Sequence, residues 1–413
     1  MLDLKQLRAE PDAARAALER RGSAGAIDVV LALDERRRAL IPQVEGLRAQ
    51  QNEANDAIAA ARKAGDGADE AITRMRAVAA GAKAITEELT TVEAELDATV
   101  ARLPNLPDPA APLEDTVLKE SGTAGATGRD HLDLAGAMID MEHGAQLSGS
   151  RFAYLRGELV FLELALVRWV LGKLQRHGFE PVIPPVLVRE AALFGTGFLP
   201  DTEQQIYHLP EDDLYLVGTS EVALASLHAG EIIDVAELPL RYAGFSPCFR
   251  REAGAAGSDS RGIFRVHQFD KVEMFCFVEP DQSPQEHERL LAIEEEILTE
   301  LAIPYRVVDI AVGDLGNSAA RKFDCEAWLP GQERYRELTS CSNTTGYQAR
   351  RLNVRARPAG GKPETLHTLN GTAVAVGRTM IALLENGQRD DGSVGLPAVL
   401  RDYGAPATLP AAS

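Results

Sequence analysis

The densest group of charged side chains in the sequence lies in residues 248–275, CFRREAGAAGSDSRGIFRVHQFDKVEMF. Two stretches typical of β-strands enclose a loop rich in Gly, Ser and Asp, which predicts a hairpin. Arg250 and Glu252 are two residues apart, so their side chains share one face of an extended strand. The guanidinium of an arginine on a rigid strand is suited to bind phosphate through paired hydrogen bonds. We therefore expect this hairpin to bind a phosphorylated substrate.

The second strand of this hairpin has two partly polar faces. One face carries Arg265, His267, Phe269, Lys271 and Glu273, and the other carries Val266, Gln268, Asp270 and Val272. A surface hairpin without a function is not expected to hold so many charges in fixed positions.

A further arginine, Arg378, stands near the start of an apolar helix predicted over residues 373–386. Such an arginine either faces solvent or binds a phosphate. The chain has no GxxxxGK[ST] segment and no strand-bound GxGxxG segment, so neither a P-loop nor a Rossmann site is supported. A nucleotide would have to be held by arginines on an antiparallel sheet.

Short strands and helices alternate around these residues. Residues 155–177 predict a long helix that is apolar on more than one face and ends at Gly178. Residues 179–188, FEPVIPPVLV, predict an edge or interface strand because prolines interrupt it. A helix is expected over about 284–302, before Pro304. Further strands are predicted at the following ranges: 214–218, 241–250, 263–278 and 305–309.

The N-terminal quarter of the chain predicts helices. Residues 1–22 indicate one or two short amphipathic helices closed by Gly22. Two heptad seams follow, joined by a turn at residues 65–67. The first seam has Leu33, Arg37, Leu40, Val44, Leu47, Gln51, Ala54, Ile58 and Ala61. The second has Met75, Val78, Ala82, Ile85, Leu89, Val92, Leu96, Thr99 and Leu103. Together they predict an antiparallel coiled coil.

Two features of this coil leave alternatives open. Pro42 either kinks the first helix near Leu40, which we favour because the seam stays in phase, or starts a new helix. The coil is acidic overall, which is typical of a solvated or oligomerising rod. Its basic residues cluster near the base, at Arg36, Arg37 and Arg38, and near the tip, at Arg62, Lys63, Arg74 and Arg76. Pro104, Pro107, Pro109 and Pro112 then indicate a stiff hinge.

Composition excludes several classes of protein. The chain has 413 residues and a net charge of −19, which argues against a nucleic-acid binder held by bulk charge but not against local recognition of RNA. The four cysteines lie far apart without a C-x-x-C pair, so we expect buried thiols in a reducing cytosol and no structural zinc. The sequence contains no secretory signal and no membrane-spanning stretch. A cytoplasmic protein is expected.

Over essentially its whole length the chain resembles the bacterial-type seryl-tRNA synthetases, members of the class II aminoacyl-tRNA synthetases. The three motifs of class II are matched in order. Residues of about 155–188, with Pro185, resemble motif one, and about 248–275 resemble motif two. Residues of about 371–386, GTAVAVGRTMIALLEN, resemble motif three. GTSEV (218–222) and ELTSCSN (337–343) are similar to seryl-specific signatures.

The resemblance implies an α+β fold with three parts. A tRNA-binding domain would occupy 1–103, with its long helical hairpin over about 28–103. A hinge and linker would follow over 104–150. The class II catalytic domain, an antiparallel sheet flanked by helices, would occupy 151–413.

The resemblance also implies the reaction. The carboxylate of L-serine attacks ATP to give seryl-adenylate, and the seryl group then passes to serine tRNA, and to selenocysteine tRNA where present. The catalytic residues would be Arg250, on the α-phosphate, and Arg378, on the γ-phosphate. ATP would be bound by Arg250, Arg251, Glu252, Val266, Glu337, Leu338, Thr339, Ser340 and Arg378. Glu337 and Ser340 would hold Mg²⁺.

Serine would be bound by Thr219, Ser220, Glu221, Glu273 and Thr372. Glu273 and Thr372 would pair with its hydroxyl, and Glu221 with its ammonium. The family more often has Ala at position 220, Ser at 251 and Ser at 372, and none of these departures removes a required charge. A homodimer is implied, with the coiled coil binding the long variable arm of the tRNA.

Three alternatives remain from the sequence. A synthetase-like protein without aminoacylation activity is expected to lack Arg250, Glu273, Glu337 or Arg378, and all four are present. A carrier-protein ligase is expected to lack the coiled coil. The sequence does not distinguish a housekeeping enzyme from a duplicate synthetase that serves antibiotic biosynthesis or resistance.

Overall fold

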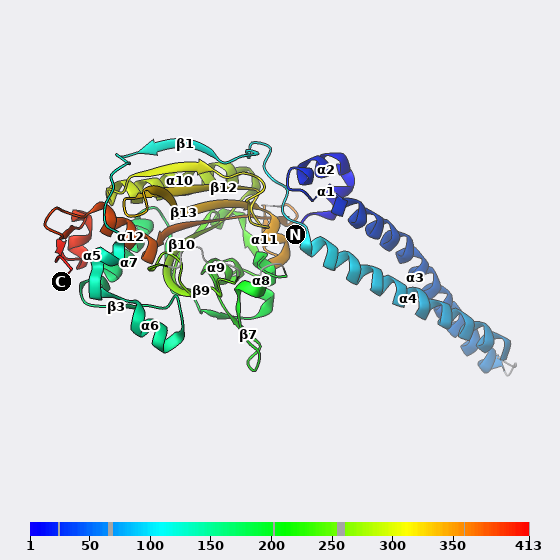
Figure 1. Cartoon of the computed structure of the whole chain (residues 1–413). Helices are drawn as coiled ribbons and strands as arrows, with labels where there is room; N and C mark the ends of the chain where they lie inside the picture. Colours follow the sequence, from blue (N-terminus) through cyan, green and yellow to red (C-terminus); the bar gives the residue numbers. More distant parts are fainter. Residues whose placement is uncertain (24, 65–68, 201–202, 254–260, 359, 413) are drawn as a thin grey trace. The chain divides into compact units, whose positions relative to one another are not determined.

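The computed structural model describes residues 1–23, 25–64, 69–200, 203–253, 261–358 and 360–412 (Figure 1). The chain divides into two compact units. One comprises Leu2–Leu103, and the other comprises Met1 and Pro104–Ser413.

The N-terminal unit is helical (Figure 1). Two short helices, α1 (Leu4–Ala9) and α2 (Pro11–Glu19), precede a long pair, α3 (Gly25–Ala64) and α4 (Asp69–Arg102). Both predicted heptad seams are confirmed, because every seam position is buried or half-buried. The turn predicted at residues 65–67 lies outside the described residues.

Helix α3 continues through Pro42 without interruption, so the alternative that a new helix begins there is wrong. Proline costs a helix about 3 kcal/mol, chiefly through one missing hydrogen bond and a clash with the preceding turn. Leu40 and Val44, on either side of Pro42, are buried, and the packing of this face offsets that cost. The kink near Leu40 stays a prediction.

The base of the coiled coil contains a buried charge that the heptad pattern did not reveal. Asp34, whose side chain is 1% exposed, accepts hydrogen bonds from Arg8 of α1 at 2.9 Å and from Arg37 and Arg38 of α3. Burial raises the pKa of Asp34, but Arg8 and Arg37 outweigh it and hold the pKa below its ordinary value. All three basic residues at the base are therefore engaged within the unit, Arg37 and Arg38 with Asp34 and Arg36 with Glu88 at 2.8 Å.

The second unit is built on a sheet of eight strands, in the order β1-β11-β12-β13-β16-β10-β9-β4. Their bounds are β1 Thr116–Ser121, β11 Tyr305–Asp309, β12 Arg321–Leu329, β13 Arg334–Thr345, β16 His367–Ala375, β10 Gln268–Val278, β9 Leu240–Phe249 and β4 Glu180–Val182. All neighbours are antiparallel except β4 and β9. The predicted α+β class is confirmed, and β4 is an edge strand as expected.

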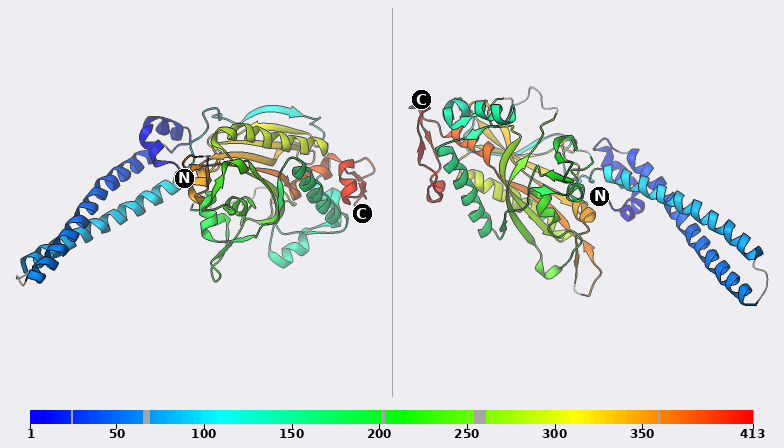
Figure 2. Two further views of the ribbon diagram at one scale, coloured as in Figure 1. Left: turned by 180° about the vertical axis from the view of Figure 1, so that it is seen from behind. Right: turned by 90° about the horizontal axis from the view of Figure 1, so that it is seen from below.

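Three helices pack on this sheet and share its main hydrophobic core (Figure 2). They are α7 (Glu158–Arg176), α10 (Ser283–Glu300) and α12 (Val376–Asn386). On β10, Val272 and Met274 lie in this core, whereas Phe269, Lys271 and Glu273 line a cavity. The strand thus presents alternate side chains to the core and to the cavity.

Several predicted boundaries are wrong. The helix predicted from residue 155 begins at Glu158, because Gly157, with φ +59°, separates it from strand β3 (Tyr154–Leu155). The strand predicted from 263 begins at Gln268. The helix predicted from 373 begins at Val376, because the preceding residues complete β16. The central strands β12, β13 and β16 were not predicted.

Other predictions are confirmed. All four cysteines are buried and unpaired. The strand over residues 305–309 has the predicted bounds, and α10 ends before Pro304. Within the described parts of the chain, no helix has the length and hydropathy needed to cross a membrane.

Candidate active site

A cavity opens on the face of the sheet formed by β10, β13 and β16, at the start of α12. The space that it encloses, with its open mouth included, is about 920 Å³. The structure brings most of the predicted site residues together in its wall: Thr219, Glu221, Arg250, Glu252, Val266, Glu273, Glu337, Leu338, Thr339, Ser340, Thr372 and Arg378.

Two predicted site residues do not line this cavity. The side chain of Ser220 is buried, and its hydroxyl donates to the carbonyl of Gly244 in β9 at 3.2 Å. Ser220 therefore does not line the cavity, and its role in binding serine stays a prediction. Arg251 is exposed, and its backbone N–H donates to Gln205. Arg251 does not line the cavity, whereas Arg250 does.

Arg250 and Glu252 both line the cavity, but they are not on one face of a strand as predicted. Strand β9 ends at Phe249, and Glu252 has a positive φ of +48°, so the alternation of a strand does not apply to this pair. Arg250 Nε donates to the carbonyl of Gly218 at 3.2 Å, and its guanidinium lies 5.2 Å from the centre of the Phe269 ring. Glu252 forms an ion pair with Arg265. The residues between 254 and 260, within the predicted loop, lie outside the described residues.

Two β-bulges set the geometry of the cavity floor. In β13, Glu337 pairs with Glu326 and Thr339 with Cys325, so Leu338 is an extra residue. Glu337 and Ser340 are three residues apart and would face opposite sides of a regular strand, but the bulge brings them to one face. In β16, Ala373 is the extra residue, and Thr372 lies directly opposite Glu273.

One end of the cavity carries two buried carboxylates. Glu273 Oε2 pairs with Lys271 Nζ and accepts a hydrogen bond from Thr219 Oγ1 at 3.4 Å. Glu221 Oε1 accepts hydrogen bonds from Gln348 Nε2 at 2.7 Å and from Asn370 Nδ2 at 2.9 Å.

The environment of Glu221 favours its protonated form. Burial and the charge of Glu273 raise the pKa of Glu221 to about 7, and the hydrogen bond from Gln348 opposes that shift. This carboxyl group therefore changes its charge near neutral pH.

The other end of the cavity is cationic. Arg378 is the third residue of α12, and its Nη1 donates to the carbonyl of Glu337 at 3.1 Å. Its guanidinium lies 4.6 Å from the centre of the Phe264 ring, and that of Arg336 lies 3.8 Å from the same ring. Burial raises the pKa of Glu337, but the charges of Arg378, Lys322 and Arg250 outweigh it and hold that pKa below its ordinary value.

The cavity wall includes residues that the sequence did not assign to the site. They are Phe198, Ile263, Phe264, Arg265, Phe269, Lys271, Asn370, Ala375 and Gly377. Phe269 and Lys271 share a face with Glu273 in the alternation of the second hairpin strand, and that signal was sufficient to find them. Phe198 and Asn370 have no comparable signal, because only the fold brings them to the cavity.

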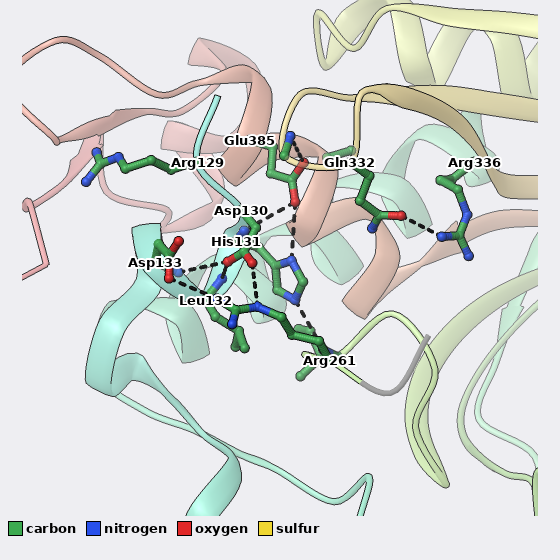
Figure 3. A network of polar contacts seen from close by, with 12 residues as sticks. Arg129, Asp130, His131, Leu132, Asp133, Arg261, Gln332, Arg336 and Glu385 are labelled. Atoms are coloured by element: carbon green, nitrogen blue, oxygen red, sulfur yellow. Dashed lines mark hydrogen bonds and ion pairs between the residues drawn. The ribbon is translucent and has the colours of Figure 1, made fainter. Parts of the chain in front are cut away.

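A polar network, buried around His131 and Glu385 and exposed at Arg261, anchors the described end of the loop within residues 248–275 (Figure 3). His131 Nε2 accepts a hydrogen bond from the backbone N–H of Ile263 at 3.2 Å, so the ring proton is on Nδ1, which faces Glu385 Oε1 at 3.2 Å. Arg261 Nε donates to Asp130 at 2.6 Å. Gly262 has φ +72°, and a Cβ there would lie 1.9 Å from the His131 ring, so only glycine fits. The network fixes the position of Ile263 and Phe264 in the cavity wall.

The N-terminal and central parts of the chain match two families. The family described as "Seryl-tRNA synthetase N-terminal domain" matches residues 1–107, and "tRNA synthetase class II core domain (G, H, P, S and T)" matches 206–387. The serine–tRNA ligase of Streptomyces coelicolor is 50% identical, with 98% of this chain and 97% of that protein covered. That of Acidothermus cellulolyticus is 51% identical, with 98% of each covered.

Solved structures are similar over the whole chain. The crystal structure of seryl-tRNA synthetase from Pyrococcus horikoshii complexed with ATP has a TM-score of 0.93 and 39% identity, with 100% of both chains covered. The cytoplasmic serine–tRNA ligase of Naegleria fowleri, in complex with AMP, has a TM-score of 0.86 and 31% identity, with 98% and 96% covered.

Proposed function

The chain belongs to the seryl-tRNA synthetase family, and from that premise we propose that its cavity activates L-serine with ATP and transfers the seryl group to tRNA. The observation that carries this proposal is that one cavity is lined by two kinds of side chain. Its carboxylates and threonine hydroxyls around Glu221 and Glu273 are suited to an amino acid, and Arg250 and Arg378, in the same wall, are suited to a triphosphate.

At the amino-acid end, Glu273 and Thr372 bind the hydroxyl of serine, and Glu221 with Thr219 binds its ammonium group. The direct pairing of Glu273 with Thr372 across the β-bulge supports this assignment, because both can reach one small polar group. A site built to hydrogen-bond a hydroxyl rejects the analogue that lacks it by ~10⁴–10⁵-fold, which accounts for the exclusion of alanine.

At the nucleotide end, Arg250 binds the α-phosphate of ATP and Arg378 the γ-phosphate. Their fixed charges stabilise the negative charge that develops as the serine carboxylate attacks and pyrophosphate leaves. The ring of Phe269 lies under the Arg250 guanidinium. Val266, three residues before Phe269, also lines the cavity. Phe269 and Val266 therefore provide an apolar surface for the adenine.

The donor set of β13 fits Mg²⁺. The bulge at Leu338 brings the Glu337 carboxylate and the Ser340 hydroxyl to one face, and both are hard oxygen donors. Mg²⁺ is usually bound by one or two carboxylates, together with substrate phosphates and waters. When bound, it supplies positive charge to the phosphates of ATP, and the lowered pKa of Glu337 keeps that ligand ionised.

The pH dependence of serine activation follows from Glu221. Its pKa is raised to about 7, so the carboxyl is protonated at lower pH and then cannot pair with the ammonium of serine. We expect kcat/KM for serine in ATP–pyrophosphate exchange to fall by about tenfold per pH unit below the pKa of Glu221. The KM for ATP serves as the control and is expected to change little over the same range. A flat serine profile from pH 8 down to pH 5 would contradict the role of Glu221.

We also propose that the N-terminal unit binds the long variable arm of serine tRNA, and of selenocysteine tRNA where present. The arginines at the base of the coil are engaged in ion pairs. The contacts are therefore assigned to the exposed basic residues near the tip: Arg62, Lys63, Arg74 and Arg76. Long-armed tRNAs would be recognised there by backbone and shape.

The protein is proposed to act as a homodimer through α7 and the segment that follows it. Val160, Phe161 and Leu164 of α7 are 39%, 55% and 57% exposed, and Ile183 beside β4 is 81% exposed. An exposed apolar face of this kind is typical of an obligate interface, which buries more than about 2,000 Å².

Light scattering is expected to give twice the chain mass of 44.5 kDa. The double variant Phe161→Glu/Leu164→Glu is expected to be monomeric, because charges at the centre of an apolar interface lose their hydration without gaining partners. Val117→Glu places the same charge on an exposed apolar residue of the opposite edge strand, β1, and is expected to remain dimeric. A monomeric parent protein would refute the proposal.

The decisive test of the proposed function has two stages. ATP–pyrophosphate exchange is measured with each of the standard amino acids, and purified tRNA is then charged with the amino acid that supports exchange. Only serine is expected to support rapid exchange, and only long-armed serine tRNA is expected to be charged. Exchange with serine but no charging of tRNA would instead favour the carrier-protein ligase, which the match of residues 1–107 disfavours.

A further inference from the structure

Behind the amino-acid end of the cavity lies a buried amide that does not line it. Gln348, in the short helix α11 (Tyr347–Leu352), is fully buried. Its Nε2 donates to Glu221 Oε1 at 2.7 Å and to the backbone carbonyl of Thr196 at 3.2 Å. Its Oε1 accepts a hydrogen bond from Thr368 Oγ1 at 2.9 Å.

These partners determine which way the amide points. The carbonyl of Thr196 is only an acceptor, so it must face the NH₂ group of Gln348. Both N–H donors of that group are then used, one on Thr196 and one on Glu221. The carbonyl end is fixed by the hydroxyl of Thr368 and, at 3.4 Å, by that of Thr344, which also donates to the backbone oxygen of Thr368 at 2.7 Å. The amide therefore has one orientation, and in that orientation it presents a donor to Glu221.

The consequence for Glu221 is that its two carboxyl oxygens have different roles. Oε1 accepts the hydrogen bonds from Gln348 and from Asn370 of β16. Oε2 accepts none from any residue that the structure describes, and Glu221 lines the cavity. A carboxylate held by one oxygen presents the other in a fixed direction without losing side-chain entropy on binding.

We propose that Gln348 is a positioning residue for amino-acid recognition, which holds Glu221 by Oε1 as an ionised acceptor and leaves Oε2 for the substrate ammonium. This inference rests on the proposed function of the cavity and names a residue that does not touch the substrate.

The charges around Glu221 explain why such a donor is needed. Burial and the nearby carboxylate of Glu273 disfavour the ionised form, whereas Lys271 of β10 and Arg250 favour it. Gln348 is a neutral donor, so it stabilises the carboxylate without adding a competing positive charge where the ammonium must bind. A lysine or arginine at this position would satisfy Glu221 and weaken its attraction for the substrate.

The test is the pH profile of serine-dependent ATP–pyrophosphate exchange for Gln348→Met and the isosteric Gln348→Glu in the full-length protein. Both variants lose the donor to Glu221 Oε1. We expect KM for serine at neutral pH to rise by ~10- to 100-fold, as for the loss of one hydrogen bond to a charged group. The midpoint of the acid limb is expected to move up by about one pH unit or more, while KM for ATP stays within about twofold.

The matched control is Ser283→Ala, which removes a buried hydroxyl that contacts His367 and Asn343 and touches neither Gln348 nor Glu221. It is expected to lower the melting temperature but to leave the serine midpoint and KM unchanged. A purely structural role for Gln348 predicts that its variants behave like this control, with an unchanged midpoint, and that result would overturn the inference. If Gln348→Met does not fold, the midpoint of Gln348→Glu decides alone.

The inference and the proposed function fail in different ways. If the parent protein shows no exchange with serine, the proposed function is wrong. If the parent exchanges with serine and the Gln348 variants keep its pH midpoint, only the role of Gln348 is wrong.

Discussion

Glu273→Ala is expected to remove most of the ability of the protein to select serine, while its affinity for ATP stays within about threefold. Glu273 Oε2 is held by Lys271 and Thr219, and no described residue donates to Oε1, which leaves this oxygen for the hydroxyl of the substrate. Since hydroxyl recognition supplies ~10⁴–10⁵-fold discrimination, we expect kcat/KM for serine to fall by about a thousandfold or more.

The measurement is ATP–pyrophosphate exchange with serine and with alanine in parallel, and it compares the ratio of their kcat/KM values. Glu273→Gln is the matched control, because it keeps the volume and one carbonyl acceptor, and an intermediate loss is expected from it. In Glu273→Ala, Lys271 remains as a buried charge without its partner, so thermal unfolding must show that the variant is folded. If a folded Glu273→Ala variant kept its selectivity for serine, the proposal that Glu273 binds the substrate hydroxyl would be wrong.

The site was predictable where a short segment of sequence contains its whole geometry. Lys271 and Glu273 are two residues apart on one strand, so alternation alone places both on the cavity face. Arg378 stands at the start of a helix that the apolar pattern predicts with an error of three residues. In these cases local periodicity was sufficient.

That Glu337 and Ser340 lie on one face of β13 could not be predicted from periodicity. Regular alternation separates residues three apart, and the bulge at Leu338 that unites them arises from pairing with β12. The strand itself was missed because polar residues follow one another along β13: Glu337 and Ser340 line the cavity, and the hydroxyl of Thr339, between them, donates to Glu294 of α10 at 2.7 Å. A strand whose two faces both hold functional or buried polar groups has no hydrophobic period to detect.

In the N-terminal coiled coil, too, the sequence predicted the local repeat but not the contact between segments distant in sequence. The heptad positions were correct because coiled-coil packing repeats locally. Asp34 lies outside that repeat and is buried because α1, which is distant in sequence, brings Arg8 to it. The basic cluster at the base of the coil therefore has a role within the unit that the sequence alone did not show.

Shortening the arm is expected to separate the two half-reactions. Deleting residues 48–85 and closing the helices with a glycine-rich turn removes the basic tip but keeps the base, where Ile27, Val30 and Asp34 pack with α1 and α2. A deletion that began at residue 28 would remove Val30 and Asp34 and expose Leu7 and Leu18, so the shorter deletion is the better design. Every residue that lines the cavity lies in the other unit. Serine-dependent exchange is therefore expected to stay within about threefold.

Charging of tRNA by the shortened protein is expected to fall by about a hundredfold or more, because each lost hydrogen bond to a charged group contributes about 1.5–3 kcal/mol and several are lost together. The fourfold variant Arg62→Ala/Lys63→Ala/Arg74→Ala/Arg76→Ala tests the tip at full arm length. Each phosphate contact that it removes is expected to lower the slope of log Kd against log salt by ~0.7–0.9. Arg102→Ala, at the opposite end of α4, also removes an exposed arginine and is expected to leave the slope unchanged. An equal loss of exchange and charging in the shortened protein would mean that the arm maintains the fold instead of binding tRNA.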